Sequence, residues 1–92
     1  MKTLADLKRA MEVGTKWKGV NHYFLCHFGV RPITKKNSRG VYFETVREDR
    51  IVECLLEWPK ASNVEFGEDG EVKIFCKWGD DERYHLLSYW KM

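Results

Sequence analysis

The chain has 92 residues, which is the length of one domain and leaves no room for a second hydrophobic core. Hydrophobic residues make up 43% of it and charged residues 33%, a balance typical of a globular domain and not of a disordered segment. The net charge is only +2 and the pI is near 8.5, below the value above about 9 that is typical of nucleic-acid-binding domains.

The N-terminal residues predict a helix over residues 3–13. Thr3 and Asp6 have the spacing of a capping box, in which each side chain accepts a hydrogen bond from a free backbone N–H at the helix start. Gly14 supplies the left-handed residue after which helices commonly end. The apolar stripe of this helix is formed by Leu4, Leu7 and Met11. Because this segment is charged and no stretch approaches the roughly 20 apolar residues of a membrane span, we expect a cytoplasmic protein without a signal peptide or membrane anchor.

From Thr15 onward the apolar residues alternate, so residues 15–92 are expected to form antiparallel strands and hairpins. Residues 33–40 and 68–70 predict the turns of two hairpins. In each of four runs, alternate residues share the face that we expect to point into the core. These faces are Val20, His22, Phe24, Cys26 and Phe28; Val52, Cys54, Leu56 and Trp58; Val72, Ile74, Cys76 and Trp78; and Tyr84, Leu86, Ser88 and Trp90.

The expected fold is therefore one α+β domain over residues 1–92. It has one N-terminal helix packed on a curved antiparallel sheet, or on a small open β-barrel, of five or six strands. Five aromatic residues fall on the face opposite to the expected core: Trp17, Tyr23, Tyr42, Phe75 and Tyr89. Two interpretations of them stay open, an exposed patch that binds a partner or a face covered by the helix.

The sequence contains no convincing catalytic or metal-binding motif. The adjacent residues Cys26 and His27 point to opposite faces of a strand, and His22 and Cys26 lie about 13 Å apart along one, so neither pair can hold one ion. The acidic residues 80–82 with His85 are expected to be a solvated turn. No GxSxG, glycine-rich phosphate loop or HExxH is present. We expect no enzyme, no metal and no cofactor.

The three cysteines are an odd number, are widely spaced and lie in apolar runs, which favours reduced thiols in a cytosolic core over disulfides. They are Cys26, Cys54 and Cys76.

Positive charge is concentrated in the first half of the chain. Residues 1–48 hold ten Lys or Arg and four Asp or Glu, giving +6, whereas residues 49–92 hold six and ten, giving −4. Cations interleaved with rings are used by strand-face binders to contact phosphates and stacked bases, and equally grip an acidic protein groove. The candidate binding residues are the cations of the first predicted hairpin and three rings near them: Arg31, Lys35, Lys36, Arg39, Trp17, Tyr23 and His27.

Four segments carry a resemblance to known proteins: LADLKRA, GTKWK, VRPITKKNSRGVYFET and WPKASNVEF. Together they resemble small proteins encoded by phages, prophages and other mobile elements of bacteria. The resemblance implies stoichiometric binding to a host component, as in anti-CRISPR and other anti-defence inhibitors, and it assigns a role to no single residue.

We therefore expect a non-enzymatic binding module, a phage-type inhibitor that occupies a host defence protein or a protein–nucleic acid surface. Two alternatives remain open. One is a small barrel that binds nucleic acid directly, and the other is a protein that captures a nucleotide signal between protomers. No membrane partner is expected.

Overall fold

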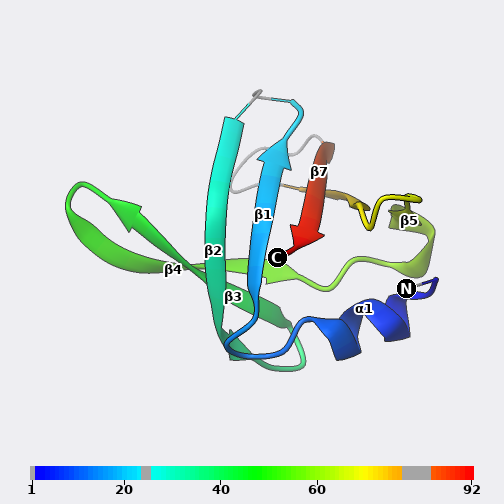
Figure 1. Cartoon of the computed structure of the whole chain (residues 1–92), viewed down its shortest axis with the longest axis horizontal. Coiled ribbons are helices and arrows are strands. Elements are labelled where there is room, and N and C mark those ends of the chain that lie inside the picture. Colours follow the sequence, from blue (N-terminus) through cyan, green and yellow to red (C-terminus); the bar gives the residue numbers. More distant parts are fainter. Residues whose placement is uncertain (1, 24–25, 78–83) are drawn as a thin grey trace.

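The computed structural model describes residues 2–23, 26–77 and 84–92, and its fold is mainly sheet (Figure 1). The strands are β1 (Lys16–Asn21), β2 (Cys26–Lys36), β3 (Gly40–Arg47), β4 (Arg50–Glu57), β5 (Val64–Phe66), β6 (Val72–Lys77) and β7 (Tyr84–Lys91). They form one antiparallel sheet in the order β4-β3-β2-β1-β7-β6-β5. The helix α1 (Leu4–Ala10) precedes them, and a short 3-10 turn, η1 (Ala61–Asn63), leads into β5.

The expected fold class is wrong, because seven strands in one sheet and one short helix replace an α+β fold of five or six strands. Strand is the main secondary structure of the described residues, whereas α1 has only seven residues. The extra strand arises where the alternation of residues 18–28 suggested one continuous run. The chain instead turns at His22 and Tyr23, so β1 and β2 are the two arms of a hairpin. Alternation of apolar residues continues in both arms and does not mark the turn.

The helix begins as predicted and ends three residues early. The capping box between Thr3 and Asp6 is present. The helix stops at Ala10 because Met11 leaves helical geometry, with φ −84° and ψ 71°, and its side chain is fully buried in the core. Gly14 does have a left-handed φ of +93°, but it lies in the turn to β1, where its N–H donates to the carbonyl of Ile33 at 2.8 Å. No helix in the described residues is long and apolar enough to cross a membrane.

The sheet is strongly rolled. Phe43 of β3 and Tyr89 of β7 stack with their ring centroids 5.6 Å apart, although β2 and β1 lie between their strands in the sheet. In a flat sheet three strand spacings of about 4.8 Å would separate them. The rolled sheet encloses one core on its inner face: Leu7, Met11, Trp17, Ile33, Val41, Phe43, Leu56, Val72, Ile74, Leu87 and Tyr89. Helix α1 lies at the end of the roll where β1 begins and β2 ends (Figure 1).

The predicted inward faces are confirmed for β4 and β6 and wrong for β7, except that Ser88 is buried as predicted. Leu56, Val72 and Ile74 are buried, whereas the buried rings and leucine of β7 are His85, Leu87 and Tyr89. The sheet register explains the reversal, because Leu87 pairs with Ile74 and Tyr89 with Val72. Directly paired residues share a face, so β7 must turn these residues inward. In the first run, Val20 is buried but His22 is exposed in the turn. Phe24 and the side chain of Cys26 in that run, and Trp78 in the third run, lie outside the described residues.

The five aromatic residues predicted to lie on the face opposite to the core are divided between the core and the surface. Trp17 and Tyr89 are each 1% exposed and belong to the core, and Tyr42 is partly buried. Tyr23 and Phe75 are exposed at 43% and 37%. They form neither one exposed patch nor one covered face.

Candidate binding site

The four cations predicted to form one basic patch point in different directions. Lys35 is exposed and lies over the Tyr42 ring, 5.0 Å from its centroid. Arg39 forms an ion pair with Glu57 at 3.1 Å. Arg31 lies on the inner side and Lys36 is bound to the helix, as described below.

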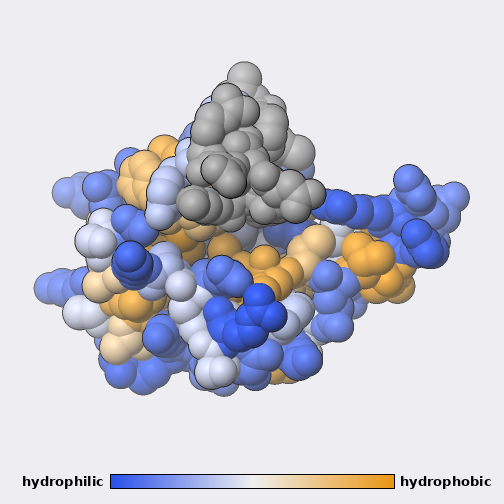
Figure 2. Space-filling view, turned by 180° about the vertical axis from the view of Figure 1, so that it is seen from behind, coloured by the Kyte–Doolittle hydropathy of each residue, from blue (hydrophilic) through white to orange (hydrophobic). Residues whose placement is uncertain are grey.

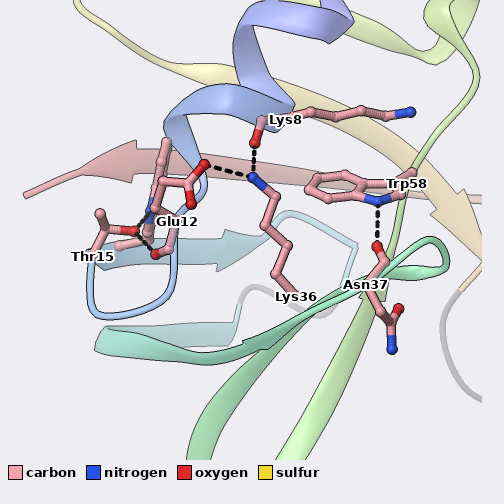
Figure 3. Close-up of polar contacts among 7 residues, drawn as sticks. Lys8, Glu12, Thr15, Lys36, Asn37 and Trp58 are labelled. Atoms are coloured by element: carbon pink, nitrogen blue, oxygen red, sulfur yellow. Dashed lines mark hydrogen bonds and ion pairs between the residues drawn. The ribbon is translucent and has the colours of Figure 1, made fainter.

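Lys36 joins the sheet to the end of α1 (Figure 3). Its Nζ lies 2.8 Å from the Glu12 carboxylate and also donates to the backbone carbonyl of Lys8. Next to it, Trp58 Nε1 donates to the Asn37 carbonyl at 3.1 Å, and the Lys8 ammonium lies 5.6 Å from the Trp58 ring centroid. These contacts hold the helix against the sheet, so Lys36 is a structural residue in this fold.

Arg31 is enclosed by rings on the inner side of β2. Its guanidinium lies 4.6 Å from the centroid of Phe28 and 5.1 Å from that of Phe43, and it donates to Thr45 Oγ1 at 2.5 Å. Burial lowers the pKa of Arg31, which nevertheless keeps a charged guanidinium beside the Tyr89 phenol. Arg31 thus makes these contacts on the inner side of the sheet.

The three predicted rings do not join these cations. Trp17 is buried rather than exposed, and its Nε1 donates to Thr15 Oγ1 at 2.9 Å. Tyr23 stacks on His85 with centroids 4.5 Å apart at the β1–β2 turn. His27 is exposed near the same turn, nine residues from Lys36 along β2, a separation of about 30 Å in an extended strand. The seven predicted residues therefore do not form one site.

A groove of about 580 Å³ lies between β4 and β6 and is the stronger candidate for a binding site. Its volume is within the range of about 300–1,000 Å³ typical of ligand sites. Seen from behind, apolar side chains gather between the body of the protein and the projecting β3–β4 hairpin (Figure 2). The groove is lined by Arg47, Cys54, Leu55, Leu56, Glu57, Trp58, Pro59, Lys60, Asn63, Phe75, Cys76 and Tyr84.

The charges of the groove are not balanced. Glu57 is already neutralised by its ion pair with Arg39. Arg47 and Lys60 have no ion-pair partner among the residues that the structure describes. The walls therefore combine rings and aliphatic side chains with two uncompensated positive charges.

The groove contains two cysteines, of which Cys76 does not have the features of a nucleophile. Cys54 and Cys76 are both free and partly buried. Burial, and after it the nearby Glu57 carboxylate, raise the pKa of the Cys76 thiol to about 11. At neutral pH this thiol is protonated, and a thiol attacks as the thiolate. Within residues 2–23, 26–77 and 84–92 no group of three His, Cys, Asp or Glu side chains is arranged to hold a metal ion.

The sequence pattern does not predict this groove. Trp58 packs against the core and Phe75 lies on the opposite face of its strand, as predicted, and both also line the groove. Arg47 and Lys60 stand in no motif. The groove exists because two strands far apart in sheet order come together when the sheet rolls, and the sequence does not reveal strand order. The acidic run at residues 80–82 lies outside the described residues, and the predicted partner of that run, His85, is buried and bonded to Asn21 at 3.2 Å.

Comparison of the chain with protein-family models, curated proteins and solved structures gave no match.

Proposed function

We propose that this chain is a non-enzymatic protein-binding module that uses the groove between β4 and β6 to hold a partner protein stoichiometrically. The observation that carries the proposal is the groove itself: apolar and aromatic walls with two cations, Arg47 and Lys60, that have no ion-pair partner in the part of the chain that the structure describes. Protein interfaces place their strongest contacts in such settings, where aromatic residues and arginine are enriched. In keeping with the resemblance, the partner is a host protein in the bacterial cytoplasm and the chain is a phage-type inhibitor.

A protein partner is favoured over nucleic acid because the cations are dispersed. Binding to a phosphate backbone depends on several cations lying along one surface. Here Lys36 and Arg39 are bound to carboxylates and Arg31 is enclosed by rings. What remains around the groove is a small number of charges at its ends, which suits a segment with one or two acidic side chains.

The protonated thiol of Cys76 supports a groove that binds its partner without catalysing a reaction. It is a potential nucleophile within the groove, yet its raised pKa keeps it as a thiol. Binding without turnover therefore accounts for the groove more simply than a reaction does.

The test is affinity capture from bacterial lysate, with and without nuclease treatment, with a tagged protein and two matched double variants. Arg47→Glu with Lys60→Glu reverses two charges in the groove. Lys16→Glu with Lys18→Glu reverses two exposed charges on β1, on the face opposite the buried Trp17. Both variants change the net charge by the same amount, so a general electrostatic effect appears equally in both.

The proposal predicts a host protein captured by the wild type and by the β1 variant and lost, by about tenfold or more, with the groove variant. Equal capture by both variants contradicts the groove as the site. Capture that disappears with nuclease indicates nucleic acid and contradicts a protein partner, as does an empty capture.

A further inference from the structure

The groove follows the edge of β4 and not one of its faces. Five consecutive residues of this part of the chain, Cys54 to Trp58, line it, although alternate residues of a strand point to opposite faces. A cavity over one face would touch only every second residue. The groove must therefore lie beside the strand, where the backbone of an outermost strand is accessible.

The hydrogen-bond pattern shows which backbone groups point into it. The N–H of Trp58 donates to the carbonyl of Arg39 at 2.9 Å, and residue pairs in an antiparallel ladder alternate between bonded and non-bonded. The even-numbered residues of β4 therefore bond to β3. The odd-numbered ones direct N–H and C=O to the free edge: Ile51, Glu53, Leu55 and Glu57. Of these, Leu55 and Glu57 line the groove.

In the opposite wall, β6 extends past the end of its ladder with β5. Gly67 donates to the carbonyl of Glu71 at 2.8 Å, so odd-numbered residues of β6 face the β5 side. The ladder between β5 and β6 ends at the pair Val64 and Ile74. Phe75 is the next residue to face that side, and the position that would oppose it belongs to η1 and not to a strand. Backbone donors and acceptors thus reach the groove from both walls.

We propose that the partner supplies an extended peptide segment that adds to the free edge of β4 as an eighth strand within the groove. Strand addition satisfies the backbone groups of Leu55 and Glu57, and alternate side chains of the segment enter the apolar groove. About five extended residues span the wall from Cys54 to Trp58. The cations at the two ends, Arg47 and Lys60, select a segment with acidic residues flanking apolar ones. This inference rests on the proposed function.

The test uses peptides selected from a displayed library of random heptamers on the immobilised protein and then synthesised. Leu55→Pro removes the one N–H that this residue offers to the groove, and it leaves the bonds to β3 intact because proline is tolerated on strand edges. Ile51→Pro makes the same change on the same edge, outside the groove. Circular dichroism checks that both variants fold. A peptide N-methylated at the positions that face β4 removes the complementary bonds, those that the peptide N–H groups donate to the carbonyls of β4, without changing the protein.

The inference predicts selected peptides rich in alternating apolar residues with Asp or Glu and without proline. Leu55→Pro weakens their binding about tenfold or more, whereas Ile51→Pro changes it less than about twofold. N-methylation of the peptide abolishes its binding to the wild-type protein, and this result does not depend on whether Leu55→Pro folds.

If the N-methylated peptide binds as well as the unmodified one, and Phe75→Ala abolishes peptide binding, strand addition is overturned but the groove remains the site. Binding unaffected by any groove substitution contradicts the proposed function as well. A concentration-dependent dimer that Leu55→Pro disrupts identifies a second copy of this chain as the occupant and overturns the inference, as does a selection that enriches no peptide.

Discussion

Leu55 of β4 and Phe75 of β6 line the two walls of one groove, although their strands do not pair and β3, β2, β1 and β7 lie between them in the sheet order. This relationship depends on the roll of the sheet, which also brings Phe43 and Tyr89 into contact. The core that closes the roll therefore determines the shape of the candidate site.

The Phe43 ring is predicted to be a main stabilising element of the roll. It is 1% exposed and stacks on Tyr89, so Phe43→Ala is expected to reduce the free energy of unfolding by about 3–5 kcal/mol. Phe75→Ala removes the same atoms from a ring that is 37% exposed in the groove, and a loss of only about 1 kcal/mol is expected. Urea unfolding measures both losses. Equal losses would show that Phe43 does not have this role.

Lys36 is predicted to stabilise the fold, in contrast to its neighbour Lys35. Lys36→Ala removes the contacts to Glu12 and to the Lys8 carbonyl, at an expected cost of about 1–2 kcal/mol. It also speeds amide hydrogen exchange in α1, because the end of the helix loses its attachment to β2. Lys35→Ala, at an exposed position, is expected to change stability by less than about 0.5 kcal/mol. Faster exchange in α1 with both variants would contradict the assignment.

The raised pKa of Cys76 predicts slow alkylation. At pH 8 a thiol with the ordinary pKa of 9.0 is about one-tenth ionised, whereas one with a pKa of about 11 is about one-thousandth ionised. Iodoacetamide should therefore modify Cys76 about a hundredfold more slowly in the folded protein than in guanidinium chloride. Its rate should rise about tenfold per pH unit through pH 9 without levelling off, since the raised pKa lies above this range. Mass spectrometry after proteolysis assigns the modified residue, and a rate that levels off near pH 9 would contradict the shift.

Local features of the fold could be predicted from the sequence. The capping box of Thr3 and Asp6 depends on residues three positions apart, and the inward positions of Val72 and Ile74 depend on alternation within one strand. The face of β7 could not be predicted from its own sequence, because Tyr84 to Trp90 places apolar side chains on both parities. Pairing with β6 decides that Leu87 and Tyr89 point inward.

The candidate site depends on contacts between residues distant in sequence. The positions of the basic residues along the chain therefore did not predict it. Adjacent cations near a turn predicted one patch, but the bulge of β2 between Ile33 and Lys35 and the neighbouring elements give each side chain a different environment. Lys36 meets α1 and Arg39 meets β4. The groove residues Arg47 and Lys60 come together with Phe75 only after the sheet has rolled.

The most direct measurement is amide hydrogen exchange of the full chain, followed by NMR, with and without the captured partner protein. Binding in the groove predicts slower exchange at the N–H groups of Leu55, Glu57 and Phe75, and unchanged exchange at Ile51, which lies on the same edge outside the groove. Protection confined to β1 and β2, or no protection at β4, would contradict the groove between β4 and β6 as the binding site.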